Sequence, residues 1–111
     1  MKIMKTSIPP VIESYFRASN ANDVEALVAC FSPDAVVLDE KQTHRGTAGI
    51  KAWGIDVRKK YEFKTEILDA AENSGGTVVT AKVAGTFPGS PVNLNFQFAL
   101  GENKITSLEI R

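Results

Sequence analysis

The sequence has little of what crosslinks and metal sites require. It contains one cysteine, Cys30, and one histidine, His44, in 111 residues. A single cysteine cannot form a disulfide within the chain, and one cysteine with one histidine cannot supply the ligand set of a structural zinc site. We therefore expect no metal site, and we interpret Cys30 as a small buried side chain on a helix rather than a reactive thiol.

Net charge of either sign is also absent. The 13 Lys+Arg residues balance the 13 Asp+Glu residues, and these charges are dispersed along the chain. The short run Arg58-Lys59-Lys60 is interpreted as the solvated end of a helix, where positive charge suits the helix dipole. This distribution argues against nucleic acid and against an anionic membrane as partners.

Long hydrophobic runs are absent too. No segment is long enough to cross a bilayer, and the residues before Pro9 hold no apolar run of the length of a signal peptide. A chain of this length is expected to form one domain, residues 1–111, around a single core. These features predict a soluble cytoplasmic protein.

Apolar residues spaced three and four apart predict helices in the first half of the chain. One helix covers 8–19 and has two prolines in its first turn, where proline is tolerated. A second helix follows Asn22 or Asp23, either of which can cap it. This helix has Phe31 on its apolar face and ends at 32–34, a Ser-Pro-Asp sequence.

A short strand and a third helix follow. The strand covers 35–38 and stops at Asp39, and a polar loop, 39–44, leads to a helix that begins at Gly46 or Thr47. The residues on the inner face of this helix are expected to be Ile50, Trp53, Val57 and Tyr61.

The second half of the chain changes to the alternating pattern of strands. Strands are predicted at 63–68, 77–87, 92–100 and 105–110, with glycine- and proline-containing turns between them, the first at 74–76. In the third strand the inward side chains are Val92, Leu94, Phe96, Phe98 and Leu100. Three helices followed by a four-strand antiparallel meander predict an α+β domain with the helices on one side of a curved sheet, and this arrangement permits a conical pocket between them.

Four segments in the first half of the chain carry a resemblance to a known superfamily. They are Tyr15-Phe-Arg-Ala-Ser-Asn-Ala-Asn-Asp23, Leu27-Val-Ala-Cys-Phe-Ser-Pro-Asp-Ala35, Val37-Leu-Asp39 and Arg45-Gly-Thr-Ala-Gly-Ile50. They resemble the nuclear transport factor 2-like superfamily, in its SnoaL-like and ketosteroid-isomerase-like branch, and the likeness covers nearly the whole chain. The resemblance implies a cone-shaped barrel in which a curved antiparallel sheet wraps around three N-terminal helices.

The resemblance also implies partners and a range of activities. In this fold the outer face of the sheet commonly forms a two-fold interface, so a homodimer is expected, and the polar row Asn93, Asn95 and Gln97 would suit its contact. The pocket would hold a small apolar ligand. The fold hosts isomerases, polyketide cyclases, epoxide hydrolases and dehydratases, and also domains without catalytic activity.

Two residues match catalytic positions of the ketosteroid isomerases. Tyr15 stands where that family has its oxyanion-binding phenol, and Asp39 stands where it has its general base. Leu94 stands where the family has a second oxyanion donor, a protonated aspartic acid. A second donor is therefore missing at that position, and Trp53 or His44 can replace it only if its side chain faces the pocket.

These groups suit proton transfer at carbon. A carboxylate at the mouth of an apolar cavity can take an acidic C–H proton, and a phenol deeper in the cavity can donate a hydrogen bond to the enolate oxygen. This predicts an isomerase, an aldol-type cyclase or a dehydratase acting on an apolar carbonyl compound, with no metal or organic cofactor required. The other side chains expected to line the pocket are Phe16, Phe31, His44, Trp53, Tyr61, Phe87, Leu94, Phe96 and Phe98.

Each of these residues also has a purely structural interpretation. Tyr15 could be a core aromatic with a satisfied hydroxyl, Asp39 could cap a loop, and His44 could be a solvent-facing loop residue instead of a proton shuttle. A cavity lining and a packed core have the same apolar composition. The sequence therefore also permits a non-catalytic domain of the same fold that binds a ligand or dimerises.

Overall fold

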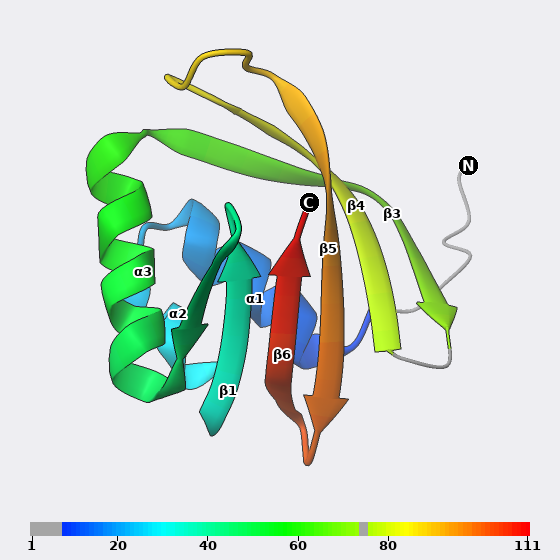
Figure 1. The fold of residues 1–111 in the computed structure, drawn as a ribbon. Coiled ribbons are helices and arrows are strands. Elements are labelled where there is room, and N and C mark those ends of the chain that lie inside the picture. Colours follow the sequence, from blue (N-terminus) through cyan, green and yellow to red (C-terminus); the bar gives the residue numbers. More distant parts are fainter. Residues whose placement is uncertain (1–7, 74–75) are drawn as a thin grey trace.

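The computed structural model describes residues 8–73 and 76–111, which form three helices and six strands (Figure 1). The elements are α1 (Pro10–Asn20), α2 (Val24–Ala29), β1 (Phe31–Asp39), β2 (Gln42–Arg45), α3 (Gly46–Lys60), β3 (Phe63–Asn73), β4 (Gly76–Gly85), β5 (Val92–Gly101) and β6 (Lys104–Ile110). One curved sheet contains all six strands, with α1 crossing one face of it and α3 standing beside β1 and β2. The predicted α+β fold is confirmed. Within the described ranges, no helix is long and apolar enough to cross a membrane.

The first two helices begin where local sequence chemistry favours a helix start. Pro10 occupies the first turn of α1, where its missing N–H costs no hydrogen bond, and Tyr15 and Phe16 are buried on the inner face. Asp23 caps α2, because its side chain accepts a hydrogen bond from the Ala26 backbone N–H at 3.1 Å. Of the two caps that the sequence permitted, the helix uses Asp23.

Two boundaries in this region differ from the sequence prediction. α2 ends at Ala29, so Phe31 begins β1 and is not part of the helix. The segment predicted as a polar loop is a hairpin, in which β1 pairs with β2 and only Glu40 and Lys41 form the turn. Both turn residues have positive φ, 53° and 65°, the geometry that matches the twist of paired strands. This hairpin is held by backbone pairing at the edge of the sheet. Its sequence therefore has little of the hydrophobic pattern from which a strand is predicted.

The sheet is mixed and strongly curved. Its order is β2-β1-β6-β5-β4-β3, in which β3 to β6 form the predicted antiparallel meander and β1 pairs in parallel with β6. The register of β3 against β4 shifts between Ile67 and Asp69, and such a bulge bends and twists a strand. β3 continues past this bulge to Asn73, beyond its predicted end at residue 68. Figure 1 shows β3 crossing from the end of α3 and then curving down beside β4.

The core between α1 and the sheet is rich in aromatic side chains. Tyr15 packs edge-to-face on Phe98, and Phe16 packs in the same way on Phe96, with ring centroids 5.5 Å and 5.2 Å apart. The ring of Phe31 joins this cluster, with its centroid 6.0 Å from that of Tyr15. These contacts fix α1 against β5 and hold Tyr15 in one orientation.

Leu100 and Tyr61, both predicted on the inner faces of regular elements, are placed differently by the structure. Leu100 is 36% exposed, because the pairing of β5 with β6 shifts register between Ala99 and Leu100. Tyr61 follows the last residue of α3 and has an extended backbone, so it leaves the stripe of that helix and packs 5.8 Å from Phe87, centroid to centroid. Of the turn predicted at 74–76, residues 74 and 75 lie outside the described part of the chain.

Candidate functional site

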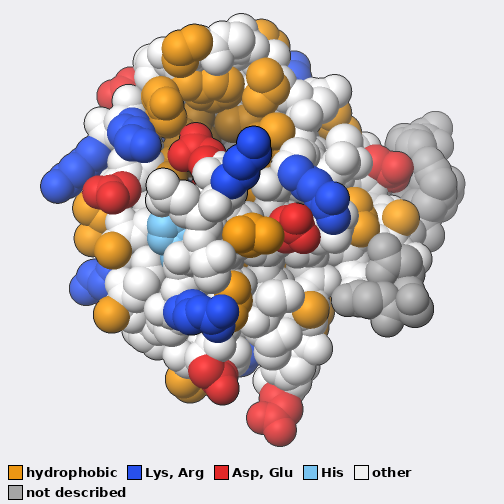
Figure 2. Space-filling view, in the orientation of Figure 1, with side chains coloured by type: hydrophobic (Ala, Val, Ile, Leu, Met, Phe, Trp, Pro, Cys, Tyr) orange, Lys and Arg blue, Asp and Glu red, His pale blue; other side chains and the backbone are white. Residues whose placement is uncertain are grey.

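A cavity of about 610 Å³ lies between α1, α3 and the concave side of the sheet. Figure 2 shows a hollow lined by hydrophobic side chains, with acidic and basic side chains beside it. Pockets that enclose small organic molecules have volumes of roughly 300–1,000 Å³. The cavity is therefore large enough for a small ligand, and its wall is mostly apolar.

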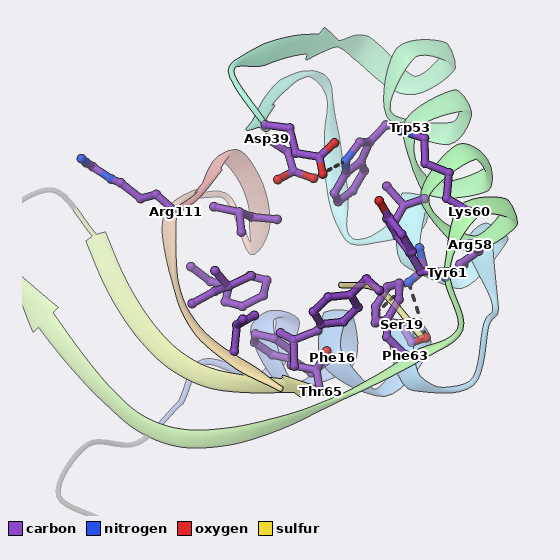
Figure 3. Close-up of a pocket in the computed structure, with 18 of the residues that line it drawn as sticks. Phe16, Ser19, Asp39, Trp53, Arg58, Lys60, Tyr61, Phe63, Thr65 and Arg111 are labelled. Carbon is purple, nitrogen blue, oxygen red and sulfur yellow. Dashed lines mark hydrogen bonds between the residues drawn. The ribbon is translucent and has the colours of Figure 1, made fainter. Parts of the chain in front are cut away.

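Asp39 reaches the cavity from the last position of β1, directly before the tight turn to β2. Trp53 on α3 donates a hydrogen bond from Nε1 to Asp39 Oδ2 at 3.0 Å (Figure 3). Among the described residues, Oδ1 of Asp39 has no hydrogen-bond donor. One carboxylate oxygen is thus held in place, and the other remains able to accept a proton.

Tyr15 lies on the α1 side of the cavity and is only 4% exposed. Burial raises the pKa of its phenol above the ordinary value; the positive charge of Arg58 opposes this rise, and the negative charge of Asp39 adds to it. Its hydroxyl makes no hydrogen bond within the part of the chain that the structure describes. The phenol therefore stays protonated at neutral pH and keeps a donor for a ligand.

Arg58 lies in the wall of the same cavity, near Tyr15. Its Nη2 donates to Ser19 Oγ at 2.7 Å and to Ser19 O at 3.4 Å, and its Nη1 donates to Gly54 O at 3.1 Å. Burial lowers the pKa of the guanidinium, and the neighbouring Tyr15 opposes that shift. The prediction that the run 58–60 is a solvated helix end is therefore wrong for Arg58, which turns inward, whereas Lys59 and Lys60 are exposed.

Most of the residues predicted for the site line this cavity. They are Asp39, Tyr15, Phe16, Trp53, Tyr61, Phe87, Leu94 and Phe96. Phe31 and Phe98 do not line it and are buried in the aromatic core. Phe98 shares the inward face of β5 with Phe96, but it lies further along the strand, where α1 covers the sheet.

His44 is also absent from the cavity wall. It lies on β2, half-buried, with its ring centroid 6.1 Å from that of Trp53. Since β1 pairs with the segment that carries His44, the residue belongs to an edge strand rather than to a loop. Trp53 Nε1 is engaged by Asp39. Neither of the two side chains considered as a second oxyanion donor is therefore free to act as one.

Several wall residues were not named for the site from the sequence, although Val57 and Val92 were predicted to face inward. Besides Arg58 they are Ser19, Glu40, Val57, Lys60, Phe63, Thr65, Val83, Pro88, Val92, Ile110 and Arg111. Phe63 and Thr65 of β3 alternate with exposed residues, so the period-two pattern of that strand indicated that they face inward. Ser19 falls one turn after Tyr15 on α1, which also pointed inward. No group of three or more His, Cys, Asp or Glu side chains that could hold a metal gathers among the described residues.

A sequence profile for SnoaL-like domains matches residues 12–101. The chain belongs to the SnoaL-like family. A candidate polyketide cyclase from Sinorhizobium meliloti is 38% identical to this SnoaL-like domain, with a TM-score of 0.90 over 94% of this chain and 95% of that one. The family predicted from the motifs is therefore confirmed. No protein of curated function matches the chain.

Two more distant structures share the fold of this SnoaL-like domain. One is a protein with a ketosteroid isomerase-like fold from Catenulispora acidiphila, in complex with trimethylamine; it is 19% identical, with a TM-score of 0.84 over 95% of this chain and 86% of that one. The other is a nuclear transport factor 2-like protein from Cytophaga hutchinsonii, 17% identical, with a TM-score of 0.75 over 97% of this chain and 93% of that one. At these identities the likeness concerns the fold alone.

Proposed function

We propose that this protein is a cofactor-independent enzyme that transfers a proton on a small, apolar carbonyl compound, as an isomerase, cyclase or dehydratase. The observation that carries this proposal is the pairing of two groups on one apolar cavity: an oriented carboxylate, Asp39, and a buried phenol with a free hydroxyl, Tyr15. A core tyrosine would have its hydroxyl satisfied by the protein, and a loop-capping aspartate would bond to its own turn. Neither description fits these two residues.

In the proposed reaction, Asp39 is the base and Tyr15 is the oxyanion donor. The free carboxylate oxygen takes a proton from the carbon next to the substrate carbonyl, and the electron pair of that C–H bond moves onto the carbonyl oxygen to form an enolate. The Tyr15 hydroxyl donates a hydrogen bond to the enolate oxygen as its charge develops. Reprotonation by Asp39 at another carbon gives an isomer. Alternatively, the enolate carbon attacks a second carbonyl carbon and closes a ring, and the alkoxide formed there takes the proton back from Asp39.

The relationship to the Sinorhizobium meliloti protein favours a reaction of the second kind. That protein is a candidate polyketide cyclase and shares 38% of its sequence with this chain over nearly its whole length. A polyketide chain has several carbonyl groups flanked by acidic C–H bonds, which is the chemistry that a base and an oxyanion donor serve. No metal or organic cofactor is needed for this step.

A non-catalytic domain that binds an apolar ligand is the second candidate. The observation that favours it is Leu94, whose apolar side chain lines the cavity where a second oxyanion donor would stand. Such a domain would bind ligands through the same apolar wall without turning them over, and Asp39 would affect only its stability.

The variant Asp39→Asn separates the two candidates. Wild type and variant would be incubated with a panel of small polyketone, enone and hydroxyketone compounds, and substrate loss would be followed by liquid chromatography. We expect turnover by the wild type and a loss of about 10²–10⁴-fold in the variant, the typical contribution of a positioned base. Ligand affinity measured by calorimetry should remain, because asparagine keeps the shape of aspartate. Equal turnover in both proteins would contradict the proposal.

We also propose that the protein acts as a homodimer in the cytoplasm, paired through the outer face of the sheet. Asn93 and Asn95 are exposed on that face of β5, and Thr80 of β4 bonds to Asn95 side chain to side chain at 3.0 Å. Polar amides of this kind can pair across a two-fold axis. Sedimentation at micromolar concentration should give a dimer that Asn95→Arg dissociates, and a wild-type monomer would refute this arrangement.

A further inference from the structure

Arg58 is a charged side chain of the cavity wall that the proposed proton transfer does not use. It leaves the last turn of α3 and reaches α1, where Ser19 Oγ accepts a hydrogen bond from it at 2.7 Å (Figure 3). The carbonyl of Gly54 accepts a second at 3.1 Å, and the guanidinium carbon lies 5.4 Å from the centroid of the Phe63 ring. These contacts hold the cation in a fixed place.

No carboxylate neutralises this cation in residues 8–73 and 76–111. The ion pairs found there join other residues, and the hydrogen-bond acceptors of Arg58 are neutral hydroxyl and carbonyl oxygens. Its Nε is buried and has no partner among the described residues. A partly buried charge without a counterion is costly to keep in a folded protein. Its position beside a cavity therefore indicates a ligand that brings the opposite charge.

The cation lies on the Tyr15 side of the cavity. Tyr15 and Ser19 are one turn apart on α1 and share a face, so a guanidinium bound to Ser19 lies on the side of the cavity that holds the phenol. Asp39 enters from the end of β1, where Trp53 holds it (Figure 3). The cavity thus has a partly buried cation on its α1 side and the Asp39 carboxylate near the hairpin.

We propose that the substrate is an anion: an apolar carbonyl compound that also carries a carboxylate, which Arg58 binds. A carboxylate brings the opposite charge, and it can accept a hydrogen bond from the Nη1 proton that the bond to Gly54 leaves free. Anchoring the carboxylate there directs the rest of the molecule along the apolar wall, with its carbonyl oxygen near Tyr15 and its acidic C–H near Asp39. The orientation of the reacting carbon rests on the proposed function, whereas the anion site itself does not.

A matched pair of probes tests the anion site. At pH 7.5, 2-naphthoate carries a carboxylate, and 2-naphthamide has nearly the same shape without the charge. Calorimetric titration of the wild type should show naphthoate binding about tenfold or more tightly than naphthamide, the preference that a hydrogen bond to a charged group supports. In Arg58→Gln this preference should disappear, with naphthamide affinity changed by less than about twofold.

Two control variants separate the effect of the charge at Arg58 from the effects of losing another cation of the wall and of unfolding. Lys60→Gln removes an exposed cation from the same cavity wall and should keep most of the preference, since exposed charges are screened by water and salt. Arg58→Lys keeps a positive charge and replaces Arg58→Gln if the melting curve of that variant shows that it is unfolded. Arg58→Lys should bind naphthoate more weakly than the wild type does, but still more tightly than naphthamide.

Failure of the anion site and failure of the proposed reaction give different results. Equal wild-type affinities for the two probes, no binding of either, or an equal loss in Lys60→Gln would overturn the anion site. A lasting preference for naphthoate together with an active Asp39→Asn would instead refute Asp39 as the base and leave the anion site standing. Loss of turnover in Asp39→Asn without any anion preference would indicate a neutral substrate.

Discussion

At the scale of single residues, the orientation of Asp39 depends on one hydrogen bond from Trp53. Trp53→Phe keeps a buried aromatic ring in the cavity wall and removes the N–H donor. We expect kcat to fall by roughly tenfold with little change in KM, because a hydrogen bond to a charged group contributes about 1.5–3 kcal/mol. Steady-state kinetics on the best compound of the panel would measure this split.

His44→Ala is the matched control for Trp53→Phe. His44 packs against Trp53 from outside the cavity, so its removal should leave kcat nearly unchanged. If Trp53→Phe raised KM while kcat stayed the same, Trp53 would be a wall residue that binds substrate and does not position the base.

Tyr15 gives a prediction on pH and stability. Burial raises the pKa of its phenol, so the folded protein keeps the proton at alkaline pH values where the unfolded chain loses it. The stability that the buried, protonated phenol contributes is therefore fully present below about pH 10, the ordinary pKa of tyrosine. It is lost as the pH rises further. Above that pH, the unfolding free energy of the wild type should fall more steeply than that of Tyr15→Phe, by up to about 1.4 kcal/mol per pH unit.

Chemical denaturation of both proteins between pH 8 and 11.5 would measure this difference. The other ionisable groups are common to the two chains, so their effects cancel to first order. Parallel curves across the whole range would mean that the phenol is hydrated in the folded protein, and they would count against a desolvated oxyanion donor.

Not every residue of the site could be found from the sequence. Tyr15 and Asp39 carried a signal, because one lies on a helix stripe within a family motif and the other ends a strand. Arg58 carried none, since an arginine beside two lysines at a helix end has the pattern of a solvated surface. Phe96 and Phe98 lie two residues apart on the same face of a strand, so their sequence pattern is the same, although only Phe96 lines the cavity.

At the scale of elements, Asn20 ties the end of α1 to β3. Its side-chain amide donates to Thr65 O at 2.9 Å and accepts from Thr65 N–H at 2.8 Å, in the manner of a neighbouring strand. Asn20→Ala leaves both backbone groups without partners, so we expect a loss of about 1–3 kcal/mol in unfolding free energy. Weaker ligand binding should accompany it, since Thr65 lines the cavity.

Gln42→Ala is the control for that loss. It removes a side-chain amide from an exposed position on the edge strand β2, and surface changes of this kind usually stay within about 0.5 kcal/mol. Urea unfolding of both variants would give the comparison. A loss in Asn20→Ala no larger than in Gln42→Ala would show that water replaces the amide and that the bridge contributes nothing.

The elements with a strong hydrophobic period were predicted correctly, and the polar strand β2 was not. The stripe of α1 and the alternation of β5 gave their positions, because one face of each is buried. β2 is an exposed edge strand of polar residues, and its tight turn uses Glu40 and Lys41 where asparagine or glycine is usual. It is held by backbone pairing with β1, which its own side-chain pattern does not reveal.

At the scale of the whole molecule, the cavity is a consequence of sheet curvature. The bulge in β3 and the hairpin at β1 shape the concave side, and the cavity lies between that side and the helices. A sequence determines which side chains face inward, but the gap between them depends on the bend of several strands together. This is why the motifs predicted the fold well and left open whether the inner space was a pocket or a packed core.

Hydrogen–deuterium exchange reports whether Asp39 and Tyr15 move a proton at carbon. Exchange of the acidic C–H protons of a bound carbonyl compound with D₂O, followed by proton NMR, reports this elementary step whatever reaction comes after it. We predict enzyme-dependent exchange with the wild type, a fall of about 10²–10³-fold in Tyr15→Phe, and none above the solution rate in Asp39→Asn. Exchange at the wild-type rate in Asp39→Asn, or no exchange for any compound that binds the cavity, would refute this proton transfer.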